Sequence, residues 1–262
     1  MIEHAIALLA LNAAVIAGVM LVAWLISVVL GDVSFIDGLW GAGFVVVAWV
    51  TLASLPQAEP RDWLIVAMVS LWGLRLAAYL FARWRREGPD PRYVRMTAGR
   101  QHKHLFTLGV VFGLQGALIL LVSLPVQWGQ LGTAGALGPV AWLGVAAWAA
   151  GLAIESTADA QMQRFKADAA NDGHVMDRGL WRYSRHPNYF GDACCWWGIW
   201  LVAAAAPLGP WAVAGPLFMT FTLMKWSGVP LLERRLKKHR PGYEDYVRRT
   251  SAFIPWPPKS GS

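Results

Sequence analysis

The chain has 262 residues, of which 56% are hydrophobic and 15% are charged, and its mean hydropathy is +0.41. Soluble domains average about 25% charged residues, so this composition indicates a protein surrounded mostly by lipid. An intrinsically disordered chain is excluded because disorder requires low hydrophobicity. Cys194 and Cys195 are the only cysteines in the sequence and are adjacent, which excludes a disulfide-stabilised scaffold.

Apolar runs recur along the whole chain, and each approaches the roughly 20 residues that a helix needs to cross a bilayer. In chain order these runs cover approximately residues 5–30, 35–55, 63–82, 105–124, 136–154, 190–206 and 211–229. The second run contains Asp37, and the seventh contains Pro216 and Lys225. We therefore predict an all-α integral membrane protein with about seven transmembrane helices.

The basic residues predict how these helices cross the membrane. All but two of the 23 Lys and Arg residues fall in three segments, 83–103, 164–185 and 225–259. With seven spans the three segments share one face of the membrane, and basic loops stay cytoplasmic. We therefore expect the N-terminus outside and the C-terminus in the cytoplasm. The net charge of +7 reflects this topology, attraction to anionic lipids, or arginines that bind phosphates, and it does not indicate nucleic-acid binding.

Polar side chains concentrate where the predicted sixth span begins, in the string WRYSRHPNYFGD at residues 181–192. Pro187 suits the first turn of a helix. The free N–H groups of that turn, together with Arg182, Arg185 and His186, would form a site for a phosphate, a pyrophosphate or a carboxylate. His186 could instead be a packed structural residue. No other His or Cys lies at metal-ligand spacing from it, so no metal site is predicted.

Two further segments carry polar residues beside predicted spans. Residues 155–170 are expected to continue the fifth helix beyond the membrane and to place Asp159 and Lys166 on one face. That segment could alternatively be a solvated helix end. In the tail, Tyr243 and Tyr246 would share the face of a helical turn, although the tail could also lie as an amphipathic helix on the membrane surface.

Asp37 lies inside a predicted span, where an ionisable side chain is costly and usually functional. Arg75 and Tyr79 lie about one turn apart in the third span and would share a face. These three residues could form a site that donates a proton to a lipid-phase substrate. Alternatively, Asp37 and Arg75 form a buried ion pair.

Together these motifs resemble those of the DUF1295 family, a bacterial membrane family similar to the C-terminal domain of steroid 5-alpha-reductases. The resemblance covers about residues 32–258 and is most specific from Glu155 onward. An early Asp-x-x-Trp-Gly signature is matched by Asp37, Trp40 and Gly41. An arginine-rich loop is matched by Arg83, Arg86, Asp90, Arg92 and Tyr93, although Pro89 stands where family members often carry an acidic residue. The later matches are the string 181–192, the spacing of Glu155, Asp159 and Lys166, and the tail residues Glu233, Tyr243, Tyr246, Phe253 and Trp256.

The steroid reductase resemblance implies a seven-helix enzyme that binds NADPH from the cytoplasmic side. It would reduce a carbon-carbon double bond conjugated to a carbonyl, in a steroid-like or other lipid. Asp37, Tyr79 and Arg75 are the catalytic candidates. The NADPH-binding candidates are Arg92, Asp159, Lys166, Arg182, Tyr183, Arg185, His186, Asn188, Tyr189, Asp192, Trp196, Glu233 and Tyr246. The chain has no Gly-x-Gly-x-x-Gly motif, so any nucleotide site would lie between helices and not in a Rossmann fold.

The resemblance also implies a multi-pass protein of the bacterial inner membrane. Residues 1–262 would form a single membrane domain, with residues 1–125 on the substrate side and residues 137–258 binding the cofactor. Its partners would be the lipid-phase substrate and membrane lipids, and no protein partner is implied.

A second resemblance implies a different chemistry. Arg-His-Pro-x-Tyr at the start of a membrane helix, followed by a Glu and a late Tyr-x-x-Tyr, is also similar to isoprenylcysteine carboxyl methyltransferases, which use S-adenosylmethionine. The reductase is favoured by Asp159 with Lys166, by the Asp37 signature, and by the many arginines, since the phosphates of a dinucleotide suit guanidinium groups. A lipid-binding or scaffold protein without activity is the third possibility.

Overall fold

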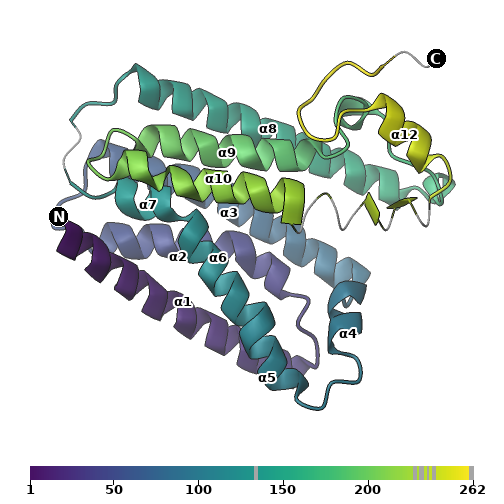
Figure 1. The fold of residues 1–262 in the computed structure, drawn as a ribbon, viewed down its shortest axis with the longest axis horizontal. Coiled ribbons are helices and arrows are strands. Elements are labelled where there is room, and N and C mark those ends of the chain that lie inside the picture. The colour runs from purple at the N-terminus through teal and green to yellow at the C-terminus, as the bar shows by residue number, and fades with distance from the viewer. Residues whose placement is uncertain (133–134, 227–228, 230–232, 235, 238–239, 260–262) are drawn as a thin grey trace. The chain divides into compact units, whose positions relative to one another are not determined.

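The computed structural model describes residues 1–132, 135–226, 229, 233–234, 236–237 and 240–259 (Figure 1). Within these residues the chain is helical and has no β-strand; Ser184 and Ser251 form an isolated bridge. This confirms the all-α class predicted from the sequence.

Among the described residues, five helical segments are long and apolar enough to cross a membrane. They are α1 (Ile2–Leu30), α2 (Ile36–Ala53), α3 (Pro60–Glu87), the segment Lys103–Val122 and α8 (Pro139–Ala167). The segment Lys103–Val122 combines α5 (Lys103–Thr107), the π-helical turn η1 (Leu108–Gly113) and α6 (Leu114–Val122). These five segments coincide with the first five predicted spans.

The sixth and seventh predicted spans take a less regular form. Helix α9 (Pro187–Ala203) has 17 residues and a length of about 26 Å, slightly less than the roughly 30 Å of a hydrocarbon core. The seventh run is divided into the 3-10 turn η4 (Gly209–Val213), α10 (Ala214–Phe221) and the π turn η5 (Thr222–Trp226). Residues 227–228 lie outside the described part of the chain. The seven-span count therefore stays a prediction.

Short helices fill the connections between the long ones. They are α4 (Pro91–Thr97), α7 (Leu124–Gly129), η2 (Ala169–Asn171) and η3 (Gly179–Arg182), and a further short helix, α12 (Tyr243–Arg249), follows the long helices. Two local predictions are confirmed here. Pro187 is the first residue of α9, and α8 continues past the fifth apolar run as far as Ala167.

The chain forms two compact units. The first contains Met1–Ala141 and Ile199–Gly215, and the second contains Trp142–Gly198 and Pro216–Ser262. The sequence predicted one membrane domain with halves at 1–125 and 137–258. The N-terminal half lies entirely within the first unit, but residues 137–141 and 199–215 of the C-terminal half also belong to that unit. Each compact unit is therefore built from two segments that are separated in the sequence.

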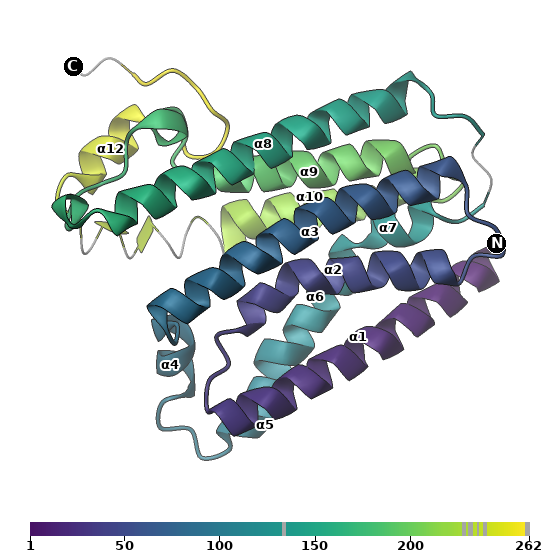
Figure 2. The ribbon, with the colours of Figure 1, turned by 180° about the vertical axis from the view of Figure 1, so that it is seen from behind.

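In the first unit, α2 and α3 lie side by side (Figure 2). Gly41 and Gly73 permit this close approach, because a Cβ added to Gly73 would lie 2.6 Å from the carbonyl oxygen of Gly41. Phe44 and Trp72 are buried in this unit, with ring centroids 5.6 Å apart. Small residues at such contacts let helix backbones meet and gain van der Waals contacts in lipid.

A buried hydrogen-bond network connects α1, α2 and α7 in the same unit. Asn12 Nδ2 donates to Thr51 Oγ1 at 3.0 Å and to Gln127 Oε1 at 3.1 Å. Gln127 Nε2 in turn donates to Ser123 Oγ at 2.9 Å. Because no water is available in the hydrocarbon region, such bonds help to specify which helices pair.

In the second unit, α8 and α9 pack through glycines. A Cβ on Gly191 would lie 2.6 Å from the backbone nitrogen of Glu155 and from the carbonyl oxygen of Gly151. A Cβ on Gly198 would lie 2.5 Å from the carbonyl oxygen of Gly144. The two helices thus contact each other backbone to backbone, which fixes the polar side chains at their ends.

Candidate functional site

A cluster of charged and aromatic side chains surrounds Asp37 in the first turn of α2. The hydroxyl of Tyr93 donates to Asp37 Oδ1 at 2.7 Å, and Arg92 Nη2 donates to Asp37 Oδ2 at 2.7 Å. Arg83 Nη2 lies 3.6 Å from the same oxygen. One carboxylate therefore has a phenol and two guanidinium groups around it. We call Asp37, Arg83, Asp90, Arg92 and Tyr93 the Asp37 cluster.

The sequence Asp90-Pro91-Arg92-Tyr93 explains how the cluster forms. Asp90 caps the start of α4 by accepting from the backbone nitrogen of Arg92 at 2.8 Å, and Pro91 occupies the first helical position. Asp90 Oδ2 also accepts from Arg92 Nε at 3.1 Å and from Nη2 at 2.9 Å. The Arg92 guanidinium is thereby held between two carboxylates, and Tyr93 is directed at Asp37.

The electrostatics of the cluster keep the phenol protonated. Burial raises the pKa of Tyr93, and the charge of Asp37 raises it further. Burial alone would raise the pKa of Asp90, but the hydrogen bonds from Arg92 outweigh burial and lower it. Tyr93 is therefore an O–H donor at neutral pH, beside an arginine that is anchored by carboxylates.

The cluster differs in part from the catalytic site predicted from the sequence. Asp37 and Arg92 are brought together, although Arg92 was predicted as a cofactor ligand. Tyr93 was recognised only as part of a family motif and received no role. Arg75 and Tyr79 are half-buried in α3, and each takes part in an interaction of its own. The helix-start signal Asp-Pro at 90–91 could have indicated that Tyr93 belongs to a fixed helical turn.

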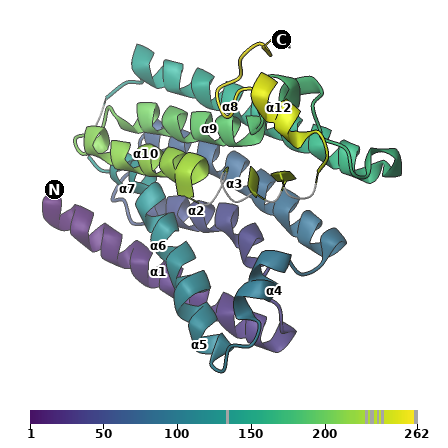
Figure 3. The ribbon, with the colours of Figure 1, turned by 45° about the vertical axis from the view of Figure 1, so that its right-hand side comes forward.

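In the second unit, much of the string 181–192 is bound by the C-terminal segment that contains α12 (Figure 3). Arg185 Nε donates to Glu233 Oε1 at 2.7 Å, and Arg185 Nη1 donates to the carbonyl oxygen of Thr250 at 2.6 Å. The hydroxyl of Tyr246 donates to the carbonyl oxygen of Trp181 at 2.5 Å. Backbone bonds join Arg185 to Ser251 and Trp256 to Tyr183. We call these contacts the C-terminal latch.

The latch also engages His186, which is buried. Its Nε2 lies 3.3 Å from Glu233 Oε1, and its ring is stacked on Tyr189 with centroids 5.5 Å apart. Burial alone would raise the pKa of Glu233, but hydrogen bonds from His186 and Arg185 lower it to about 2. Glu233 is therefore ionised at neutral pH and holds both neighbours.

Other predicted NADPH-binding residues fall into two groups. Asp159, Asp192 and Trp196 are buried on α8 and α9, and Asn188 Nδ2 donates to Asp159 Oδ1 at 3.3 Å. Lys166, Arg182 and Tyr183 are exposed. The structure thus brings Asn188 and Asp159 together at the start of α9, as expected for one site, while Arg185 and Glu233 serve the latch.

A surface hollow of about 330 Å³ lies where α8 ends. It is lined by Gln161, Arg164, Phe165, Asn171, Met176, Arg178 and Gly179. Asn171 Nδ2 donates to the carbonyl oxygen of Phe165 at 3.1 Å and thus fixes one wall. Arg164 and Arg178 are exposed and form no ion pair with any residue that the structure describes. From the sequence, both arginines belong to the basic segment 164–185, and neither is among the named cofactor-binding candidates, because no local sequence pattern indicates that the loop 168–178 brings them to one hollow.

No metal centre is visible in the described part of the chain, since no three His, Cys, Asp or Glu side chains there lie close enough to hold an ion.

Replacing Glu233 with Gln should loosen the latch, because Arg185 and His186 would lose their anionic partner. We expect a loss of about 1–3 kcal/mol of stability. The folded-state pKa of Glu233 is depressed from 4.5 to about 2, so its contribution is present above about pH 4.5 and is lost as the pH falls toward 2. Limited proteolysis at a series of pH values from 7 to 2, with an acid-active protease at the lower values and a neutral one above them, would measure it.

The matched control for this prediction is Glu244→Gln, since Glu244 is exposed in the first turn of α12. It should leave the cleavage rate and its pH dependence unchanged. Equal cleavage of the Glu233→Gln variant and the unmodified protein at neutral pH would show that the latch does not depend on this carboxylate.

Comparison with known proteins gives a family and no characterised relative. The family model described as a protein of unknown function, DUF1295, matches residues 23–250. No curated protein and no solved structure matches the chain. The similarity to steroid 5-alpha-reductases therefore stays a prediction from the motifs. The matched region covers more than half of the sequence and contains the Asp37 cluster, the α8–α9 pair and most of the latch, and the protein belongs to the DUF1295 family.

Proposed function

We propose that this protein is an NADPH-dependent membrane oxidoreductase that reduces a carbon-carbon double bond conjugated to a carbonyl in a lipid. The observation that carries the proposal is the Asp37 cluster, in which a protonated phenol and an anchored guanidinium adjoin a helix that is apolar enough to cross a membrane. Conjugate reduction needs donors of this kind at the carbonyl oxygen, where negative charge develops. A solvated surface cluster would not require a half-buried phenol directed at a carboxylate.

In this proposal the Tyr93 hydroxyl contacts the substrate, and Asp37 holds that hydroxyl in position. When a carbonyl oxygen enters, the Tyr93 hydroxyl transfers its hydrogen bond from Asp37 to that oxygen. Bound NADPH would supply the hydride that adds to the β-carbon, and the electron pair of the double bond moves to the oxygen as an enolate. Tyr93 and Arg92 stabilise this enolate until the α-carbon takes a proton from water. Both oxygens of Asp37 accept hydrogen bonds, one from the Tyr93 hydroxyl and one from Arg92, so we assign the donor role to Tyr93 and not to Asp37.

The second unit offers groups of the chemistry that a dinucleotide needs. Arg164 and Arg178 line one hollow with Gln161, which provides two cations and one amide nitrogen for phosphate oxygens. The Asn188–Asp159 pair supplies further hydrogen-bonding groups at the start of α9. These donor types suit NADPH better than S-adenosylmethionine, which carries no phosphate.

We further propose seven membrane spans, with the N-terminus outside and the basic segments in the cytoplasm of a bacterial cell. The support is that all but two of the 23 Lys and Arg residues then lie on one face. NADPH is a cytoplasmic cofactor, so the proposed function requires this orientation for the second unit.

NADPH should raise the melting temperature of the detergent-solubilised protein, and S-adenosylmethionine should not. A ligand at 100 times its Kd stabilises the folded state by about 2.7 kcal/mol. The double variant Arg164→Gln/Arg178→Gln should lose most of the NADPH shift, because both phosphate-binding cations are removed.

The control for that variant is Arg86→Gln/Lys259→Gln, which removes the same charge from two other exposed positions. It should keep the full NADPH shift. A shift with S-adenosylmethionine and none with NADPH would replace the reductase by the methyltransferase alternative, and a shift with neither would favour a protein without this chemistry.

Tyr93→Phe should lower kcat for NADPH oxidation by a lipid-phase enone at least about 100-fold, since it removes the donor at the carbonyl oxygen. The NADPH-dependent melting shift should remain, which separates turnover from cofactor binding. Asp37→Asn should lower kcat as well, because the phenol loses its positioning partner. Tyr79→Phe is the matched comparison. If it abolished turnover while Tyr93→Phe did not, the donor would be the tyrosine in α3.

The topology can be read from single cysteines in a Cys194→Ala/Cys195→Ala background. Ala136→Cys lies between the fourth and fifth spans and should react with a membrane-impermeant thiol reagent added outside intact cells. Ala98→Cys lies in the basic segment after α3 and should react only after the cells are opened. Both positions are exposed in the structure. The reverse pattern would invert the proposed orientation.

A further inference from the structure

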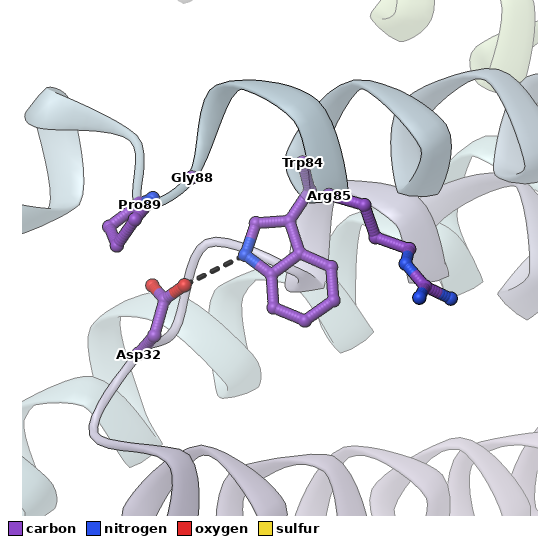
Figure 4. A pocket seen from close by; sticks show the side chains of 5 residues that line it. All are labelled: Asp32, Trp84, Arg85, Gly88 and Pro89. Atoms are coloured by element: carbon purple, nitrogen blue, oxygen red, sulfur yellow. Dashed lines mark hydrogen bonds between the residues drawn. The ribbon is translucent and has the colours of Figure 1, made fainter.

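A hollow of about 530 Å³ lies in the first unit at the end of α3 (Figure 4). Asp32, Trp84, Arg85, Gly88 and Pro89 line it. Figure 4 shows the indole of Trp84 between the Asp32 carboxylate and the Arg85 guanidinium. The hollow thus has an acidic end, an aromatic floor and a basic end. Its volume lies within the range of pockets that hold small ligands.

The acidic end is a fixed carboxylate. Asp32 Oδ1 accepts from the backbone nitrogen of Ser34 at 2.8 Å, and Oδ2 accepts from Trp84 Nε1 at 2.7 Å. Burial alone would raise the pKa of Asp32, but these hydrogen bonds outweigh it and lower the pKa. The carboxylate is therefore ionised, and each oxygen retains capacity to accept a further bond.

The aromatic floor and the basic end are also held in place. The ring of Phe35 packs against Trp84, with centroids 5.9 Å apart, and fixes the indole. Arg85 is exposed and forms no ion pair with any residue in the described ranges. Its guanidinium is therefore available to an anion from outside the chain.

The position of the hollow limits what can fill it. Helix α3 has 28 residues and a length of about 42 Å, which exceeds a hydrocarbon core of about 30 Å. Trp84 and Arg85 lie in its last turn. If α3 spans the bilayer, this turn lies at the depth of lipid headgroups, where Trp and Arg side chains are favoured.

We propose that this hollow binds the phosphoethanolamine headgroup of a membrane phospholipid. The ammonium group lies over the face of the Trp84 indole, which attracts cations, and beside the Asp32 carboxylate that is bonded to the edge of that ring. The phosphate lies against the Arg85 guanidinium. A headgroup with one positive and one negative end matches both ends of the hollow, whereas a purely anionic headgroup would meet Asp32 unfavourably. This proposal is independent of the reductase proposal, since it uses none of the same residues.

Native mass spectrometry of the full-length protein in detergent can test this. The probes are phosphatidylethanolamine and phosphatidylglycerol with identical acyl chains. The unmodified protein should retain more of the ethanolamine lipid. Asp32→Asn should lower retention of that lipid about tenfold, because the ammonium loses its carboxylate partner, and it should not lower retention of the glycerol lipid, whose anionic headgroup is no longer repelled. Arg85→Gln should lower retention of both lipids, because both carry the phosphate.

Arg86→Gln is the matched control, since Arg86 follows Arg85 in the same turn but does not line the hollow. This variant should leave the retention of both lipids unchanged. Equal retention of the two lipids by the unmodified protein, or unchanged ethanolamine-lipid retention in the Asp32→Asn variant, would overturn the proposal.

Two further measurements complete the test. Melting temperature without lipid reports whether Asp32→Asn is folded; if it is not, the contrast between Arg85→Gln and Arg86→Gln decides. The second measurement is the melting temperature with soluble glycerophosphoethanolamine, which carries the same headgroup without acyl chains. If it raises the melting temperature as much as the lipid does, the ligand is a free headgroup ester, and the assignment to a membrane lipid is wrong.

Discussion

A polar group inside a bilayer must find its partner within the protein, and this constraint governs where the polar side chains of this chain can lie. Asn12 shares its amide with Thr51 and Gln127 in the first unit. Asp37 is met by Arg92 and Tyr93, which come from the short helix after α3. The functional chemistry we propose uses a cluster whose charged groups already have partners within the protein.

The two units meet this constraint in different ways. In the first, charged side chains at helix ends turn toward one another and form the Asp37 cluster. In the second, α8 and α9 touch at Gly151 and Gly191, which leaves no room for side chains along the contact. Polar groups such as Asn188 and Asp159 therefore gather at the end of that contact. A site built on such rigid helix ends loses little conformational freedom when it binds a ligand.

Local patterns in the sequence predicted the helices better than the site. Apolar runs gave the first five long helices, and Pro187 marked the start of α9, because both signals act over neighbouring residues. Partners distant in sequence could not be predicted in this way. Tyr93 and Asp37 are 56 residues apart, and Arg185 meets Thr250 across 65 residues. Arg185 illustrates the difficulty. Its positive charge and its place just before a predicted helix indicate a phosphate ligand, whereas in the structure it donates to backbone carbonyls.

The C-terminal latch has a consequence for biosynthesis. Residues 243–256 are translated after every part of the second unit that they bind. While α9 is being inserted, Ser184 and Arg185 therefore lack the carbonyl oxygens of Phe253 and Thr250 to which they later donate, and the Trp181 carbonyl lacks the Tyr246 hydroxyl from which it later accepts. Maturation of this unit is completed only when the last helix has emerged from the ribosome, so a premature stop codon before Tyr243 would leave an inserted but unfinished protein for quality-control proteases.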